Sequence, residues 1–170
     1  IWIGAGIPEK AAPYLRQVFQ MDSLPKDAHL YICSAGWHTV RINGVSPDDR
    51  VLAPSVSQYD RRVFYVDYPV AELLRKGKNT IVLSLGNSLY NDFSHSASDF
   101  IRATWRDRVK VICELVADGK TVLSSSRQWK VTASPVIYNN IRCGEHYDAR
   151  LEIPGLDQAD FDDSAWPNAV

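Results

Sequence analysis

The chain has 170 residues, of which 45% are hydrophobic and 23% are charged, as in an ordinary soluble globular protein. This length supports one domain with a hydrophobic core and is scarcely enough for two. Lys and Arg number 19 against 20 Asp and Glu, so the formal charge of -1 gives no electrostatic reason to expect a nucleic acid or an anionic membrane surface as a partner. No apolar run approaches the length of a membrane span.

Alternation of apolar and polar side chains with a period of two predicts most of the secondary structure. The pattern is less regular over residues 15–21, where Val18 and Phe19 fall on opposite faces. It is clear over residues 30–43, 81–85 and 109–115. Runs of this kind, rich in Val, Ile, Tyr and Phe, are typical of strands with one buried face.

Turn signals separate the predicted strands. Asn43-Gly44 closes one strand, and Asp118-Gly119 lies between strands at 112–117 and 121–123, where an Asp-Gly pair favours a hairpin. Residues 69–75 begin with Pro and have a Gly just beyond their end, which predicts a helix of about two turns. The predicted fold is all-β, an antiparallel sandwich or jelly roll with one short helix.

Two segments carry no periodic pattern. Residues 87–107 predict a loop of roughly twenty residues, a length that is usually functional or mobile, with Phe100, Ile101 and Trp105 tying its far end to the core. The acidic residues 154–170 are expected to be a linker towards a following domain. We therefore expect a single domain, 1–170, with a core sandwich over 15–153. The polar residues of the loop are Asn87, Ser88, Asn91, Asp92, Ser94, His95, Ser96, Ser98 and Asp99.

The chain begins with Ile-Trp-Ile and carries no signal peptide, so we expect a trimmed piece of a longer protein. Its three cysteines, Cys33, Cys113 and Cys143, have unrelated spacings and predict no disulfide framework. Cys33 and Cys113 lie in apolar strand patterns and are interpreted as small core residues. One disulfide stays open as an alternative if the protein is exported.

Motifs for catalysis and metal binding are missing from the sequence. It contains no P-loop, no GxGxxG after a strand, no HExxH and no GxSxG. No two histidines have ligand spacing, so no metal site is predicted. Ser94-His95-Ser96 with Asp92 or Asp99 matches no triad order, and a solvated loop is the interpretation. We predict no catalytic residue.

Glu145 and Asp148 form the only close pair of carboxyl groups in an aromatic and polar setting. Glycosidases need two carboxyl groups that face each other across a sugar-sized gap. We expect Asp148 to pair with Arg150 or to cap a turn, and Glu145 to bond nearby backbone. A contact with a sugar or with a neighbouring domain is the alternative for both.

Aromatic residues at predicted strand ends and in loops are candidate platforms for a sugar ring. An aromatic face stacks on the apolar C–H face of a sugar, while amides bond the hydroxyl groups. For each single residue, a role in the core or in a turn is the preferred interpretation, and a sugar platform is the alternative. The aromatic candidates are Trp37, Tyr59, Tyr90, Trp105 and Tyr138, and the amides are Asn87, Asn91, Asn139 and Asn140.

Three groups of segments, taken in order, resemble one family over residues 15–166. The first is 30–37 with Asn43-Gly44 and 51–54. The second is 59–63 with 74–80 and 85–87. The third is 138–140 with Gly144-Glu145-His146-Tyr147-Asp148-Ala149-Arg150 and the Phe-Asp-Asp-Ser-Ala-Trp motif at 161–166. The set is similar to the N-terminal β-sandwich domain of bacterial α-L-rhamnosidases, whose fold resembles the galactose-binding-like jelly roll.

The resemblance implies a non-catalytic role for this chain. Those enzymes hydrolyse terminal α-L-rhamnosides with inversion, using acidic residues of an (α/α)-barrel that lies beyond this chain. Some members carry a sandwich that binds L-rhamnose through calcium, with an Asp-Asn pair and a further Asn. Trp37-His38-Thr39 lacks the acidic pair, Asn87 matches the further Asn, and Ser55-Val56 replaces the usual Gly-Trp. No cofactor is predicted, with calcium as the alternative.

We predict an accessory domain of an α-L-rhamnosidase, with the catalytic barrel of the same polypeptide as partner. The alternative is a carbohydrate-binding module with its own sugar site. The compartment stays open between export and the cytoplasm of a bacterium. The candidates for sugar binding or domain contact are Trp37, Tyr59, Asn87, Tyr90, Asn139, Asn140, Glu145 and Asp148.

Overall fold

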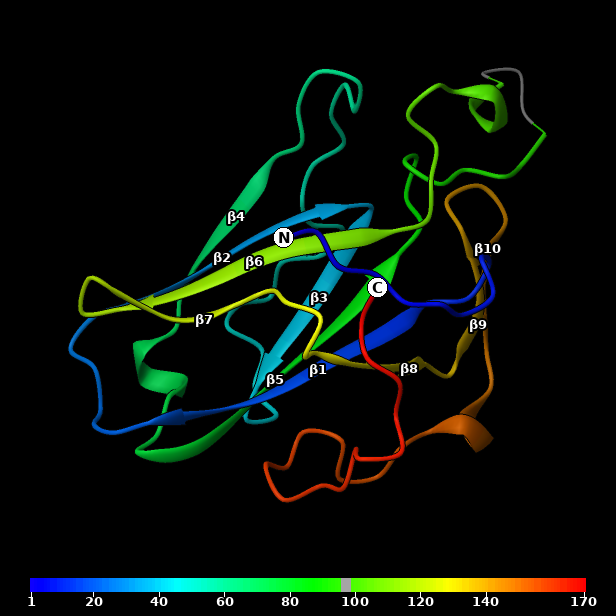
Figure 1. Ribbon diagram of the computed structural model, residues 1–170. Helices are drawn as coiled ribbons and strands as arrows, with labels where there is room; N and C mark the ends of the chain where they lie inside the picture. Colours follow the sequence, from blue (N-terminus) through cyan, green and yellow to red (C-terminus); the bar gives the residue numbers. More distant parts are fainter. Residues whose placement is uncertain (96–98) are drawn as a thin grey trace.

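The computed structural model describes residues 1–95 and 99–170, and its strands form two four-stranded sheets and one hairpin (Figure 1). Their orders are β3-β5-β1-β8, β4-β2-β6-β7 and β10-β9, and every paired strand is antiparallel. The strands are β1 (Pro13–Met21), β2 (Ala28–Ala35), β3 (Trp37–Ile42), β4 (Tyr65–Pro69), β5 (Gly77–Gly86), β6 (Lys110–Ala117), β7 (Lys120–Ser124), β8 (Lys130–Ala133), β9 (Val136–Asn140) and β10 (Gly144–Tyr147). The predicted all-β antiparallel sandwich is confirmed.

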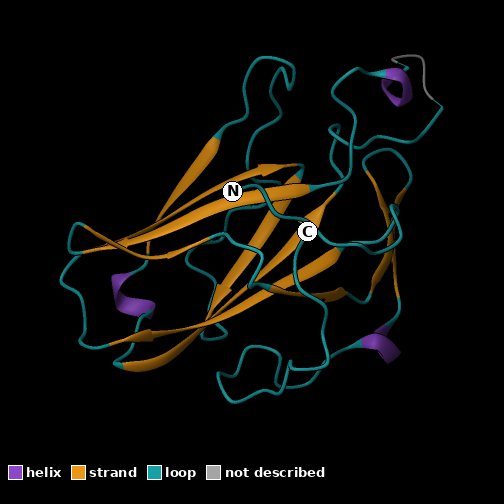
Figure 2. Ribbon diagram, in the orientation of Figure 1, coloured by secondary structure: helices purple, strands orange, loops and turns teal. Residues whose placement is uncertain are grey.

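The predicted two-turn helix at 69–75 is wrong. Pro69 ends β4, where it pairs with His29, and a single 3-10 turn follows, η1 (Ala71–Leu73). Val70 supplies no side-chain cap, and its backbone N–H donates to the carbonyl of Ala28 instead of opening a helix. The other helical turns of the described chain are η2 (Phe100–Arg102) and η3 (Ala149–Leu151), as Figure 2 shows.

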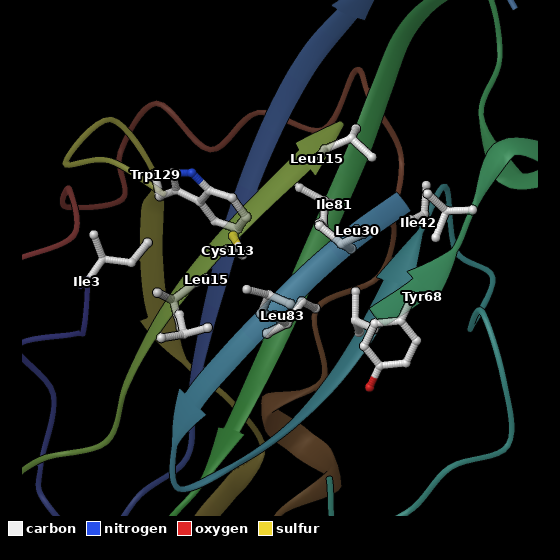
Figure 3. Close-up of a cluster of buried hydrophobic side chains, with 14 of the residues drawn as sticks. Ile3, Leu15, Leu30, Ile42, Tyr68, Ile81, Leu83, Cys113, Leu115 and Trp129 are labelled. Carbon is white, nitrogen blue, oxygen red and sulfur yellow. The ribbon is translucent and has the colours of Figure 1, made fainter. Parts of the chain in front are cut away.

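The hydrophobic core lies between the two four-stranded sheets. Leu30 and Ile32 of β2, Leu83 of β5 and Leu115 of β6 are at most 1% exposed, and they come from the alternating positions that the sequence pattern singled out. Figure 3 shows such side chains directed toward one another between the sheets. Burying a Leu or Ile side chain stabilises a fold by about 1.5–3 kcal/mol, so this layer is the main source of stability.

The three cysteines occupy different environments. Cys113 lies in the core as predicted, and burial raises its pKa to about 12. The interpretation of Cys33 as a core residue is wrong, because its side chain lies on the outer face of β2 and is half-buried. Cys143 is exposed in the turn between β9 and β10, and all three are free thiols.

Residues 154–170, expected to be a linker, pack on the sandwich, and we call them the C-terminal segment. Ala169 belongs to the core, and Val170 exchanges two backbone hydrogen bonds with Gly4, so the two chain ends lie close together (Figure 1). Arg16 of β1 is fully buried beneath this segment and donates to the carbonyls of Leu156 and Gln158. The part of the outer face of the β3-β5-β1-β8 sheet around Arg16 is therefore covered.

The loop that follows β5 is present at 87–95 and 99–109, with η2 as its only regular element in the described residues. Ser96 and Ser98 lie outside the described residues. Phe100, Ile101 and Trp105 are half-buried, and the Trp105 ring contacts Phe100 and Tyr59 at centroid distances of 6.2 and 6.3 Å. No helix of the described chain is long and apolar enough to cross a membrane.

The predicted hairpin is confirmed, with Asp118 and Gly119 between β6 and β7 at φ of 47° and 74°. We expect Gly119→Ala to lower the free energy of unfolding by about 1 kcal/mol, because a Cβ disfavours positive φ. Gly6→Ala is the matched control, since neither glycine has an atom within 4 Å of an added Cβ and only Gly119 has positive φ. Urea unfolding gives the free energy of unfolding of both variants, and equal values would contradict the prediction.

Candidate functional site

A hollow of about 560 Å³ at one end of the sandwich brings together four of the eight predicted site residues, and we call it the central hollow. Trp37 begins β3, Asn139 and Asn140 end β9, and Glu145 lies in β10. The side chains of Leu52, Val136 and Ile141 add apolar surface. The full lining is Ala12, Trp37, His38, Thr39, Leu52, Ser84, Leu85, Gly86, Ser88, Val136, Asn139, Asn140, Ile141, Gly144 and Glu145.

Asn87 is fully buried next to the hollow and holds backbone in place. Its N–H donates to Oδ1 of Asn139 at 2.7 Å, and its Nδ2 donates to the Asn139 carbonyl at 2.9 Å. Its Oδ1 accepts from Nδ2 of Asn91 at 2.9 Å. The donors and the acceptor of Asn87 are thus engaged within the protein, which joins the end of β5 to β9.

Asp92, which sequence reasoning treated only as a loop residue, anchors the same region. Its fully buried carboxylate accepts from the backbone and hydroxyl of Ser94, from Nδ2 of Asn140 at 3.0 Å, and from Nε of Arg142 at 3.3 Å. Burial opposes ionisation, but the hydrogen bonds from Ser94, Asn140 and Arg142 outweigh it and lower the pKa of Asp92. Asn140 therefore serves the loop as well as lining the hollow.

We expect Asp92→Asn to lower the free energy of unfolding by about 2 kcal/mol, because an amide NH2 turned toward these donors leaves a buried group unsatisfied. Asp60→Asn is the control, since Asp60 is exposed and has no hydrogen bond or ion pair in the described structure. Urea unfolding of both variants measures the difference. An Asp92→Asn protein as stable as the control would contradict the anchoring role.

Tyr59 and Tyr90 lie apart from Trp37 and Glu145, in a second hollow of about 350 Å³. Their rings meet edge to face at a centroid distance of 5.2 Å, and Trp105 packs beside Tyr59. Nε1 of Trp105 is buried and has no acceptor in the described part of the chain. Ser88 adjoins both hollows, because it lines the central one and its Oγ lies 3.4 Å from the Tyr59 hydroxyl.

The two predicted carboxyl groups have separate surroundings. Asp148 caps η3 by accepting from the backbone N–H of Arg150 and also pairs with the Arg150 guanidinium at 2.7 Å, as predicted. The hydrogen bond from Arg150 lowers the pKa of Asp148. Glu145 is exposed, and its carboxylate makes no hydrogen bond within the described residues, where we expected one to backbone. Only Glu145 of the two lines the central hollow.

Tyr138 uses its ring within the protein and does not line the central hollow. It stacks on His146 at a centroid distance of 4.8 Å and meets Phe93 edge to face at 5.6 Å. No group of three His, Cys, Asp or Glu side chains within residues 1–95 and 99–170 is placed to hold a metal ion. The absence of a cofactor, with calcium as the alternative, stays a prediction.

His38 is a buried polar residue that sequence reasoning missed. Its Nδ1 lies 2.7 Å from Oγ of Ser34, and its Nε2 lies 3.0 Å from the hydroxyl of Tyr68. These contacts join β3 of one sheet to β2 and β4 of the other. Burial, with a further contribution from the positive charge of Arg50, lowers the pKa of His38 to about 4.

Comparisons with known proteins agree on one family. Residues 23–170 match the family model described as "Alpha-L-rhamnosidase N-terminal domain". An α-L-rhamnosidase of Formosa agariphila is 33% identical over 162 residues, which cover 92% of this chain and 17% of that protein. The crystal structure of the Aspergillus terreus α-L-rhamnosidase superposes with a TM-score of 0.91 at 29% identity, over 99% of this chain and 20% of that one.

A third relative is the Streptomyces avermitilis α-L-rhamnosidase, whose crystal structure was determined in complex with L-rhamnose. It superposes with a TM-score of 0.86 at 26% identity, over 95% of this chain and 16% of that one. The chain therefore spans a fifth or less of the length of these relatives.

Proposed function

Because this chain belongs to the α-L-rhamnosidase N-terminal domain family, we propose that it is a non-catalytic accessory domain that packs against the catalytic barrel of the same polypeptide. The whole polypeptide would hydrolyse terminal α-L-rhamnosides. The observation that carries this proposal is the environment of the carboxyl groups. Hydrolysis of a glycoside needs an opposed pair. Here Asp148 is bound to Arg150, and Glu145 is the only carboxylate among the described residues that line the central hollow.

The test compares the full-length polypeptide with this chain alone on an aryl α-L-rhamnoside. We expect turnover by the full-length polypeptide and none by the isolated chain. Glu145→Gln in the full-length polypeptide should leave the chemical step unchanged, because Glu145 is not placed opposite a second carboxyl group. Turnover by the isolated chain would contradict the proposal.

A second candidate function is carbohydrate binding, and the central hollow favours it. Trp37 and Glu145 line the same hollow, which offers an aromatic ring for the C–H face of a sugar and a carboxylate able to accept from its hydroxyl groups. That carboxylate has no partner among residues 1–95 and 99–170. The volume of about 560 Å³ lies within the usual range for small-molecule sites.

Isothermal titration of the chain with L-rhamnose, with and without calcium, tests this second function. Binding with a millimolar or tighter dissociation constant, lost in Trp37→Ala and weakened in Glu145→Gln, would support it. Tyr147→Ala is the control, because Tyr147 is exposed and lies outside the central hollow. No heat of binding, either with or without calcium, would contradict carbohydrate binding by this chain and would leave the proposed accessory role unaffected.

A further inference from the structure

The outer face of the β4-β2-β6-β7 sheet carries an unusual set of side chains, and we call it the aromatic sheet face. The strand register places outward residues of β2 directly between those of β4 and β6. A solvent-facing side of an antiparallel sheet is normally polar. Seven of these nine residues are aromatic, aliphatic, Pro or Cys, and only two are acidic. The rows across the sheet are Pro69, His29 and Val116, then Asp67, Tyr31 and Glu114, then Tyr65, Cys33 and Ile112.

Aromatic rings run along this face. His29 stacks on Tyr31 at a centroid distance of 6.0 Å, and Tyr31 meets the edge of Tyr65 at 6.0 Å. A shallow hollow of about 310 Å³ is lined by Tyr31 and Tyr65 together with Cys33 and Ile1. Tyr65 is 66% exposed and Ile1 is 64% exposed, so the apolar surface is open to solvent. Contiguous exposed apolar surface of this kind marks interaction sites.

The two outer faces of the sandwich differ. The C-terminal segment covers part of the opposite sheet, and Arg16 and Arg41 hold it there through Asp163 and Asp157. On the aromatic sheet face, every one of the nine residues stays half-buried or exposed. Figure 1 shows the C-terminal segment running below β1 and β8, away from β4 and β2.

Acidic side chains outnumber the one basic side chain, His29, among the nine residues and Asp27. Asp67 and Glu114 lie within it, and Asp27 lies at its edge, 3.4 Å from Nε2 of His29. His29 shares a 2.6 Å hydrogen bond with Asp67, which raises the pKa of His29. A complementary partner would therefore present basic groups around an apolar centre.

We propose that the aromatic sheet face is the surface on which a further domain of the same polypeptide docks, through a basic and partly apolar patch. A polypeptide as long as the relatives has ample chain for such an occupant, because this chain covers only 16–20% of their length. The inference rests on the proposed accessory role and adds to it the surface used and the chemistry of the partner.

Thiol labelling of the full-length polypeptide tests the docking surface. Tyr65→Cys places a thiol on the aromatic sheet face, and Leu24→Cys is the matched control, because Leu24 is 64% exposed and lies in the loop before β2. Peptide-resolved mass spectrometry gives the maleimide labelling rate at each site. We expect Tyr65→Cys to react at least about tenfold more slowly than Leu24→Cys, since a docked surface must open before it reacts.

A charge reversal provides the second arm. Glu114→Lys should raise the labelling rate at Tyr65→Cys, whereas Glu72→Lys, exposed in η1, should leave it unchanged. Equal rates at Tyr65→Cys and Leu24→Cys in an active rhamnosidase would overturn the docking surface alone. A full-length polypeptide without rhamnosidase activity would contradict the proposed function instead. A maleimide labelling rate at Tyr65→Cys that falls as the protein concentration rises would identify a second copy as the occupant and overturn the proposal.

Discussion

Replacing Arg16 with Met is expected to lower the free energy of unfolding by about 3 kcal/mol, because it leaves the carboxylate of Asp163 without its buried partner. Arg16 is fully buried and joins β1 to the C-terminal segment. It donates to the carbonyls of Leu156 and Gln158 at 2.9 and 2.6 Å and pairs with Asp163. The guanidinium also lies 5.4 Å from the ring centre of Phe161. Urea unfolding followed by tryptophan fluorescence measures the change.

The matched control is Arg61→Met, since Arg61 is exposed and its side chain makes no hydrogen bond or ion pair in the described structure. That substitution should change stability by less than about 0.5 kcal/mol. The free energy of unfolding of Arg16→Lys should lie between those of Arg16→Met and Arg61→Met. An ammonium group lacks the planar guanidinium that reaches two carbonyls and a carboxylate together. An Arg16→Met protein as stable as Arg61→Met would show that the C-terminal segment is held by other contacts.

Acidification should destabilise the protein through His38. The unfolded chain has a histidine with the ordinary pKa of 6.5, whereas the folded pKa is about 4. Between these values the unfolded state binds a proton that the folded state does not, so stability is lost as pH falls from about 6.5 to about 4. The difference corresponds to about 3 kcal/mol. Comparing the pH dependence of unfolding with that of His38→Gln isolates this contribution, because the carboxyl groups are common to both proteins.

Nuclear magnetic resonance of the histidine rings gives an independent measurement. His38 should stay neutral until pH approaches about 4, while His29, whose pKa is raised by Asp67, should titrate above its ordinary range. The pKa values of His29 and His38 are thus shifted in opposite directions, upward by the hydrogen bond with Asp67 and downward by burial. A His38 ring that titrates together with an unfolded reference would contradict the buried link between the sheets.

The sequence singled out eight candidate residues, and their role in binding a sugar or contacting a domain stays a prediction. Trp37, Asn139, Asn140 and Glu145 do line one hollow. It did not predict that Asn87 and Asn140 bond to other parts of the chain, because an amide at a strand end has the same local pattern whether it faces solvent or backbone. Tyr59 and Tyr90 were grouped with Trp37 as aromatic residues at predicted strand ends or in loops, and the structure places them in a separate hollow.

Regular alternation and turn residues were enough to predict the hairpin at Asp118-Gly119, the sandwich class and strands over residues 15–21, 30–43, 81–85, 109–117 and 121–123. They did not predict β4, β8, β9 or β10. The predicted features depend on neighbours in sequence and on the period of two that a half-buried strand requires. Only the tertiary structure decided the partners of the buried polar groups. Asp163 is 147 positions from Arg16, Arg142 is 50 from Asp92, and Tyr68 is 30 from His38. Such contacts leave no local pattern, because burial of a charge or an imidazole becomes tolerable only when a distant partner arrives with the fold.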